Sequence, residues 1–354
     1  MLQTSISIDP FDFRTADEAA HAAYNDHLNR IRAEQLPDDP PRSLARARAY
    51  WENFPAFVEQ WNWLAVTAAG EVVGSSAVRV QRTRDNQHLA SCSVAVEPQW
   101  RRNGIARRLL RPVAERARAE ERRLSVFRTH SRVPAGEAFM RHIGATPGLS
   151  EDMNQLDLAD LDRPLLDTWQ AHAPDGFVLA FREAPYPEEE LPAMAALTNM
   201  AMNEAPRDDL EKEDVNFTAD ELRAWEAFLL GRGYHLWYIG ARDKATGELA
   251  GGTEIALDPE EPTIVHQLGT GVYHRYRRRG IGRWLKAAML QRLLEEWPEG
   301  RFVRTANATS NASMLKINHE LGFRLYQRSM DWQIETERVL DYLHASSVAA
   351  ATAA

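Results

Sequence analysis

The chain has 354 residues, of which 44% are hydrophobic and 26% charged, and its net charge is -9 at pH 7. This length and composition are typical of about two soluble domains, and the negative charge argues against a general nucleic-acid binder. The single cysteine, Cys92, excludes an internal disulfide framework, and no stretch has the length and apolarity of a membrane-spanning helix. The N-terminal residues lack the features of a signal peptide. We therefore expect a cytoplasmic protein without membrane or nucleic-acid partners.

The predicted elements follow the same order in both halves of the chain. A polar helical region comes first, followed by two apolar segments around a glycine turn, which is typical of a β-hairpin. A further strand leads into an arginine- and glycine-rich turn and an amphipathic helix, and a short strand and a last helix close each copy. In the first copy these elements are expected at about 15–60, 63–80, 89–96, 105–117 and 124–143, and in the second at about 188–230, 236–255, 263–272, 281–297 and 301–321.

Three short sequence landmarks recur in the same order at nearly the same offset, which indicates a duplicated domain. The offsets are 177, 176 and 178 residues. Each match alone is weak, but three in register over half the chain are hard to obtain by chance. The matching pairs are GEVVG (70–74) with GELAG (247–251), RRNGIA (101–106) with RRRGIG (277–282), and HIGA (142–145) with ELGF (320–323).

The duplication predicts where the domains begin and end. We expect an N-terminal domain over residues 1–165 and a C-terminal domain over 166–345. The segment 157–175, rich in Asp and Leu and containing two prolines, is the expected junction. The alanine-rich end, 346–354, is expected to be a disordered tail.

The repeated arginine and glycine turns have the chemistry of an anion site. A strand that feeds a glycine turn and then a helix leaves the free N–H groups of the first helical turn pointing outward, where the helix dipole favours negative charge. Glycine allows a phosphate to approach the backbone, and arginine adds attraction. A plain surface turn would explain one copy, whereas two copies favour a diphosphate site. The rival Rossmann site requires G-x-G-x-x-G, which both turns lack.

These turns resemble the acetyl-CoA motif of the GNAT acetyltransferases, Arg-x-x-Gly-x-Gly/Ala, and 321–323 (LGF) matches the next motif of that superfamily. The second copy is the better match, and a tandem pair of such domains is similar to the mycothiol synthases. The resemblance implies an α+β protein of two tandem GNAT domains, each a mixed twisted sheet flanked by helices. It also implies acetyl-CoA as acyl-donor co-substrate, with no metal.

The resemblance further implies which residues hold the co-substrate. The strand around Gly271 should part from its neighbour and pair with the pantetheine arm, and the Val272 amide should stabilise the oxyanion. The amides that follow should hold the diphosphate. The implied binding residues are Thr270, Gly271, Val272, Arg277, Arg278, Arg279, Gly280, Ile281, Gly282, Arg283 and Asn311 in the second copy, and Val94, Val96, Arg102, Gly104 and Ala106 in the first.

Candidate bases occur only in the second copy. An alkylamine is mostly protonated at neutral pH, so its acetylation needs a general base. Glu254 aligns with Ala77, and His266 aligns with Ala90. We therefore expect the second copy to be catalytic and the first to be a degenerate partner that can still bind CoA. His266 is the first choice as base, because its place on the strand resembles that of the base in many GNAT enzymes. Equally good alternatives are that His266 is only a hydrogen-bonded strand residue and that Glu254 is only a solvent-facing one.

The general acid is harder to identify. The superfamily's usual tyrosine is replaced by Asn318 in the second copy and by Met140 in the first. Asparagine can hydrogen-bond the sulfur but cannot give it a proton. Tyr326 or a water molecule can take that part.

The loop 203–214 is the candidate substrate wall. It holds six carboxylates, among them Glu204, Asp208 and Asp209, which suit a cationic, amino-bearing small molecule. A solvated run of surface charge is the alternative.

Together these observations predict an acetyl-CoA-dependent N-acetyltransferase, acting on a primary amine of a small molecule by direct attack on the thioester. The alternatives are an acyltransferase that uses another acyl-CoA or a mycothiol-like precursor amine, and a non-catalytic CoA-binding regulatory protein. The protein is expected to be a monomer or a homodimer.

Overall fold

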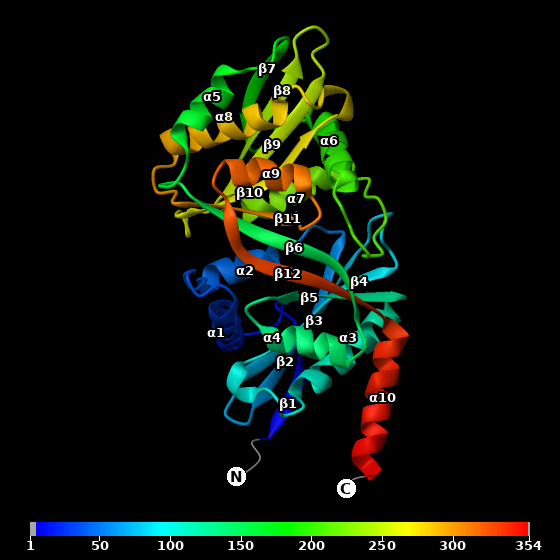
Figure 1. Cartoon of the computed structure of the whole chain (residues 1–354). Coiled ribbons are helices and arrows are strands. Elements are labelled where there is room, and N and C mark those ends of the chain that lie inside the picture. Colours follow the sequence, from blue (N-terminus) through cyan, green and yellow to red (C-terminus); the bar gives the residue numbers. More distant parts are fainter. Residues whose placement is uncertain (1–4, 353–354) are drawn as a thin grey trace. The chain divides into compact units, whose positions relative to one another are not determined.

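The computed structural model describes residues 5–352 and divides into two compact units, each built from both halves of the chain (Figure 1). The N-terminal unit comprises the chain up to Ser150, Arg207–Glu213, and the chain from Ser329 onward. The C-terminal unit comprises Glu151–Pro206 and Asp214–Arg328. These units differ from the contiguous domains 1–165 and 166–345 that the repeat predicts, because each repeat ends in the other unit.

The N-terminal unit contains a mixed sheet in the order β1-β2-β3-β4-β5-β12. Only β4 and β5 are parallel, and every other neighbouring pair is antiparallel. The last strand pairs with β5 through Ser329–Glu335. The strands are β1 (Ile6–Phe11), β2 (Val58–Thr67), β3 (Val72–Gln81), β4 (Leu89–Val96), β5 (Leu124–His130) and β12 (Arg324–Glu335).

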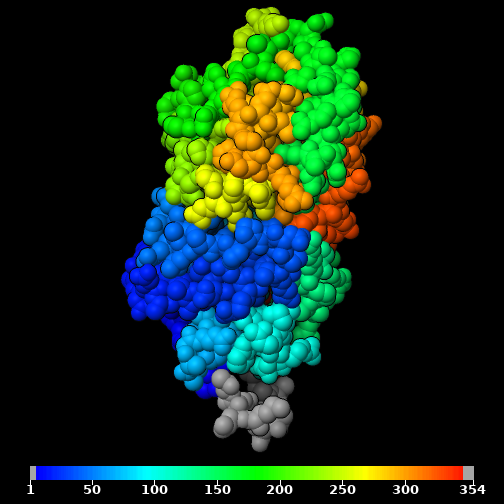
Figure 2. Space-filling model, turned by 90° about the vertical axis from the view of Figure 1, so that its left-hand side faces the viewer, coloured from blue at the N-terminus to red at the C-terminus, as the bar shows by residue number. Residues whose placement is uncertain are grey.

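Helices cover both faces of this sheet. On one face, aromatic side chains of α1 (Glu18–Gln35) and α2 (Leu44–Glu52) pack on β1 and β2. The segment that contains these two helices (blue) forms a broad part of the surface in Figure 2. The other face is covered by α3 (Ile105–Ala119), α4 (Pro134–His142) and α10 (Thr336–Thr352). Where a disordered tail was expected from residue 346, α10 continues as a helix to Thr352, and residues 353–354 lie outside the described part of the chain.

The C-terminal unit repeats this architecture with the strand order β6-β11-β10-β9-β8-β7. One face packs on α5, α8 and α9 and the other on α6 and α7. Its strands are β6 (Thr146–Asp157), β7 (Phe177–Glu183), β8 (His235–Asp243), β9 (Leu249–Leu257), β10 (Ile264–Val272) and β11 (Phe302–Ala308). Its helices are α5 (Arg163–Ala171), α6 (Leu191–Glu204), α7 (Ala219–Gly231), α8 (Ile281–Glu296) and α9 (Ala312–Glu320).

The two repeats exchange their last strand and the helix that follows it. In the C-terminal unit, β6 pairs with β11 through Glu151–Asp157, and Leu166 of α5 joins the core beneath α8. In the N-terminal unit, Trp332 of β12 and Leu340 of α10 join the core beneath α3. Because β6 and β12 hold equivalent places in the repeat, either strand has the pattern needed to pair at either position. The pattern along the chain therefore does not reveal the exchange.

Helix α8 buries a lysine that has no counterpart in the first copy. Lys286 is 2% exposed, whereas Leu110 stands at the equivalent place in α3. The ammonium lies 5.7 Å from the centre of the Phe323 ring, and desolvation lowers the pKa of Lys286 to about 8. Burying an ammonium group on folding costs free energy, so Lys286 destabilises the C-terminal unit at neutral pH.

Replacing Lys286 with methionine is expected to raise the free energy of unfolding at pH 7 by about 1–3 kcal/mol. The gain should shrink as the pH rises from about 8 towards 10.5, because the folded wild type sheds its proton over this range before the unfolded chain does. Urea denaturation at pH 7 and pH 10 measures both values. Equal stability of the two proteins at pH 7 would contradict the expected penalty.

Candidate active site

Two equivalent turns connect a central strand to a helix in the two units. In each, a short 3-10 turn follows the strand, and a glycine in the left-handed region caps the helix, Gly104 at φ 73° and Gly280 at φ 86°. Arg102 and Arg278 are also left-handed, at φ 67° and 60°. The amides of the first helical turn have no partner within the helix. Each turn therefore has unpaired backbone amides at a helix N-terminus, which is what the predicted anion site requires.

The first arginine of each turn anchors the turn to a helix. Its Nε donates to the carbonyl oxygen of the last residue of the preceding strand, at 3.0 Å in the first copy and 2.9 Å in the second. Arg101 also pairs with Glu34 at the end of α1, and Arg277 pairs with Glu204 at the end of α6. Two expected site residues, Arg277 for the diphosphate and Glu204 for the acceptor, thus meet in one ion pair.

Other expected co-substrate residues have protein partners as well. The Arg279 guanidinium lies 5.8 Å from the centre of the Tyr276 ring, and Arg283 donates to Glu320 at 2.8 Å. The Asn311 side chain caps α9. Ile281 is buried in the core, and Gly282 follows it in the first turn of α8. An anion at this turn would therefore be held by the backbone amides rather than by these side chains.

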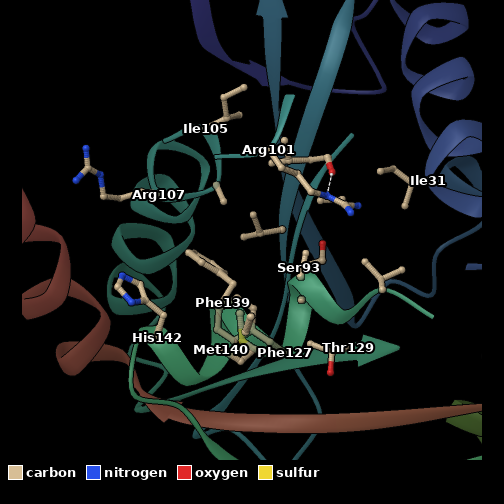
Figure 3. Close-up of a pocket in the computed structure, with 18 of the residues that line it drawn as sticks. Ile31, Ser93, Arg101, Ile105, Arg107, Phe127, Thr129, Phe139, Met140 and His142 are labelled. Carbon is tan, nitrogen blue, oxygen red and sulfur yellow. Dashed lines mark hydrogen bonds between the residues drawn. The ribbon is translucent and has the colours of Figure 1, made fainter. Parts of the chain in front are cut away.

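A cleft of about 620 Å³ opens in the N-terminal unit where β4 and β5 part. The two strands pair over Leu89–Cys92 and Leu124–Phe127, and the cleft lies beyond that stretch. Figure 3 shows it running from the parted strands to the N-terminus of α3. All five residues expected to bind CoA in the first copy line it: Val94, Val96, Arg102, Gly104 and Ala106.

The N-terminal cleft is largely apolar. Ile31 of α1 lies on one side, and Phe139 and Met140 of α4 lie on the other (Figure 3). Met140 takes the place of the superfamily's acid, and Ala77 and Ala90 take the places of the two candidate bases. The cleft can hold an extended chain beside a diphosphate, but it has no titratable group at those three positions.

The equivalent strands of the C-terminal unit also part. β10 and β11 pair over Ile264–His266 and Phe302–Arg304, and β10 bulges between Gln267 and Thr270. The Thr270 hydroxyl lies 2.8 Å from that of Thr253 on β9. Further along, the Tyr273 amide donates back to β9, and the amides of successive strand residues point to opposite sides. The Val272 amide is therefore directed away from β9, towards the gap, as an oxyanion donor there must be.

Glu254 lies on β9 opposite the bulge of β10. The Tyr186 hydroxyl donates to Glu254 Oε1 at 2.6 Å. Desolvation raises the pKa of Glu254 to about 7; the Tyr186 hydrogen bond opposes this rise, and the charge of Glu226 adds to it. A carboxyl group with a pKa near neutral is suited to general base catalysis at physiological pH.

His266 lies on the same face of the sheet as Glu254. Its cross-strand partner, Ala256, packs among the residues beneath α6 and α7, as does Tyr238, the partner of Glu254. The His266 ring lies 6.3 Å from that of Tyr234, edge to face. His266 is still within the stretch that pairs with β11, whereas Glu254 is opposite the bulge beyond it. Glu254 is therefore the better placed of the two candidates.

Asn318 is fully buried on α9. Its Nδ2 donates to Asn307 Oδ1 at 2.8 Å, and its own Oδ1 has no hydrogen-bond partner among the described residues. The Arg304 guanidinium lies over the ring of Tyr326, the alternative acid, at 4.2 Å. Asn318 can therefore form a hydrogen bond to a ligand, but it cannot supply a proton.

The acidic loop expected to line the C-terminal site is divided, and its larger part, Arg207–Glu213, belongs to the N-terminal unit. The Asp209 amide donates to the Gly148 carbonyl at 3.0 Å, and the Asp209 carbonyl accepts from Gln333 at 2.7 Å. Asp208 precedes it in the same segment, Arg207–Glu213. Hydrogen bonds hold this segment in the N-terminal unit, so Asp208 and Asp209 belong to a different unit from Glu254.

Sequence reasoning missed Tyr186, whose hydroxyl donates a hydrogen bond to the candidate base Glu254. It lies 68 residues from Glu254 and outside every repeated landmark. No local spacing could have identified it, because only the packing of the loop before α6 against β9 creates the contact.

Two mixed sheets, each with a parted pair of parallel strands above a helix N-terminus, define the fold of an acyl-CoA N-acyltransferase. The profile of the acetyltransferase (GNAT) family matches residues 25–144 and 195–323. The chain therefore belongs to the GNAT family and is an acyltransferase with two tandem GNAT domains of the α+β class. GNAT proteins generally use acetyl-CoA.

Solved structures share this architecture. A tandem GNAT protein from the clavulanic acid biosynthesis pathway is 26% identical, with a TM-score of 0.79 over 94% of this chain and 99% of that chain. A GCN5-related N-acetyltransferase from Sphaerobacter thermophilus is 14% identical, with a TM-score of 0.65 over 94% and 96%. A fungal glucosamine N-acetyltransferase region is 12% identical, with a TM-score of 0.63 over 94% and 38%. No curated protein sequence matches the chain.

None of the helices within residues 5–352 combines the length and apolarity required to cross a membrane. Within the same residues, no group of three or more His, Cys, Asp or Glu side chains is arranged to hold a metal ion.

Proposed function

We propose that the protein transfers the acetyl group of acetyl-CoA to a primary amine of a small molecule by direct attack, and that the C-terminal unit carries the reaction. The observation that supports this most is Glu254, whose pKa is raised to about 7 beside the parted strands of that unit. The N-terminal copy has Ala77 at this position and contains no substitute there. We assign to the N-terminal cleft the binding of an acyl-CoA without turnover.

In this mechanism the residues of the C-terminal unit have separate tasks. The amides at the start of α8 would hold the diphosphate, and β10 would pair with the pantetheine arm. Glu254 would accept a proton from the amine as its nitrogen bonds to the thioester carbon. The Val272 amide would stabilise the oxyanion until the carbon–sulfur bond breaks. Asn318 would hydrogen-bond the departing sulfur, which takes its proton from water.

A matched pair of variants tests which unit carries the reaction. Thiol release from acetyl-CoA is measured across a panel of small amines and aminosugars, and the product is identified by the added mass of one acetyl group. Gly280→Glu places a carboxylate at the diphosphate turn and strains a left-handed position, so we expect activity to fall at least about 100-fold. Gly104→Glu makes the same change in the N-terminal unit, and we expect it to leave turnover within about threefold of wild type.

The opposite pattern, activity lost only in Gly104→Glu, would reverse the assignment of the two units. Circular dichroism of both variants shows whether each remains folded. Tight CoA binding without turnover of any amine would contradict the proposed reaction and favour a CoA-binding regulatory role. Turnover with a longer acyl-CoA alone would favour a different donor.

A further inference from the structure

The hydroxyl of Tyr238 is buried without a hydrogen bond. The side chain lies on β8 and is 7% exposed, and its Oη has no partner among the described residues. Tyrosine hydroxyls are usually hydrogen-bonded when buried, because an unmade hydrogen bond is costly. An unpartnered hydroxyl beside a candidate catalytic carboxylate therefore indicates a group kept for a ligand.

Glycines surround the tip of this phenol. A Cβ built on Gly252 would lie 2.1 Å from Tyr238 Oη, so the hydroxyl rests directly on that glycine. Gly252 pairs with Gly240 on β8 and with Gly271 on β10, which together form a row of three glycines across the sheet. Any larger residue at Gly252 would displace the phenol. The row allows the hydroxyl to lie flat against the strands beside β10.

The phenol lies next to Glu254 and one strand away from Val272. Tyr238 is the direct cross-strand partner of Glu254 on β9, so both side chains emerge on the face covered by α6 and α7. Gly271, at the end of the glycine row, immediately precedes Val272, whose amide is directed towards the gap. The hydroxyl and the carboxylate therefore flank the same part of β10.

The arrangement is specific to the C-terminal copy. The register places Asn62 where Tyr238 stands, and Leu64, Ser75 and Ala95 where the three glycines stand. The Asn62 Oδ1 accepts a hydrogen bond from Gln60 Nε2, so this oxygen has a partner within the protein. The unpartnered hydroxyl thus occurs together with the candidate base and is absent where the base is absent.

The phenol remains neutral at any pH at which the enzyme works. Burial raises the pKa of Tyr238, and the nearby charge of Glu254 raises it further. A neutral hydroxyl can accept a hydrogen bond from an N–H group. The Glu254 carboxylate can also accept one, in addition to the hydrogen bond that it accepts from Tyr186. Two acceptors of different kinds are thus available to an amine.

We propose that Tyr238 Oη accepts one N–H of the acceptor amine while Glu254 accepts the other, so that the site selects primary amines. This inference rests on the proposed function. With both N–H groups held, the nitrogen lone pair points at the thioester carbon. The nitrogen–carbon bond forms, the carbon–sulfur bond breaks, and the amine proton passes to Glu254; Tyr238 gains and loses no proton. A secondary amine lacks the second N–H, and its substituent would meet the phenol.

The test compares two amines and two phenylalanine variants. The amines are the primary amine of the panel with the highest kcat/KM and its N-methyl derivative. Tyr238→Phe is expected to lower kcat/KM for the primary amine about 10-fold and to leave that for the N-methyl amine within about twofold. The matched control, Tyr186→Phe, removes a hydroxyl that donates to Glu254, so it should lower both values by the same factor.

A stability measurement keeps the test independent of turnover. Because Tyr238 Oη has no partner among the described residues, Tyr238→Phe should leave the urea midpoint of unfolding unchanged or raise it, whereas Tyr186→Phe should lower it. Equal loss for the two amines, or a lower midpoint in Tyr238→Phe, would overturn this inference and leave the proposed function intact. Failure of the wild type to acetylate any amine would overturn both.

Discussion

Replacing Glu254 with glutamine is expected to lower kcat/KM for the acceptor amine about 100- to 10,000-fold at pH 8, the range that general base catalysis contributes. The wild type should gain activity as the pH rises through about 7, where Glu254 loses its proton. Glutamine cannot accept a proton, so the variant should lack that step and retain only the titration of the amine itself. Initial rates of thiol release from pH 5.5 to 9 measure both profiles.

The same substitution should stabilise the protein above neutral pH. The folded-state pKa of Glu254 is raised from 4.5 to about 7, so the folded chain binds more protons than the unfolded chain between these values. The stability contributed by this group is fully present below about 4.5 and is lost as the pH rises to about 7. Glu254→Gln should therefore be about 1–3 kcal/mol more stable than wild type at pH 8 and similar at pH 5.

A loss of activity combined with a gain in stability distinguishes a base from a structural glutamate. His266→Asn serves as the comparison, and we expect it to change kcat/KM by less than about 10-fold. A pH profile that loses its step near 7 in His266→Asn but keeps it in Glu254→Gln would reverse the roles of the two residues.

Ending the chain at Arg328 is expected to unfold the N-terminal unit, although every residue of the first repeat is retained. The truncation removes the strand that pairs with β5 and the whole of α10. At about 1.5–3 kcal/mol for each large apolar side chain, the loss of buried side chains is comparable to the whole stability of a typical domain. The buried residues removed are Trp332, Ile334, Val339, Leu340 and Leu343.

A chain ending at Ser347 is the matched control, because it keeps all of these side chains. Urea denaturation and limited proteolysis should show two folded units in the control and one in the chain ending at Arg328. The fragment 1–165 should likewise fail to fold alone, since it lacks the same strand. A stable, cooperatively unfolding fragment 1–165 would contradict the exchange of strands between the repeats.

The elements around each anion site were predicted closely from the sequence. The strand expected at 89–96 is β4, and the helix that begins at Ile105 is α3. In the second copy, the helix expected to stop at Trp297 ends at Glu296. These elements depend on local features: the apolar period sets the helix face, and a glycine at positive φ sets the helix start. Local features are visible along the chain.

The sequence pattern did not reveal the exchange of strands or the residues that surround Glu254. Tyr186 reaches Glu254 across 68 residues, and Asp209 belongs to a segment whose hydrogen bonds run to Gly148 on β6 and to Gln333 on β12. Neither contact leaves a periodic or spaced pattern. Nothing in the sequence distinguishes Tyr238 either; its hydroxyl is unusual only because it has no hydrogen-bond partner among the described residues.

The sequence by itself determined the duplication, the GNAT class and the position of both glycine turns, because each follows from short-range backbone requirements that recur at a fixed offset. Only the tertiary structure decided which segments form each unit and which side chains surround Glu254. Strand exchange changes the strand with which each last strand pairs, but it leaves the sequence pattern of every element unchanged. The desolvation of a carboxylate depends on residues far away in the chain. The raised pKa of Glu254, on which its proposed role as a base depends, is therefore a property of the fold rather than of its sequence neighbours.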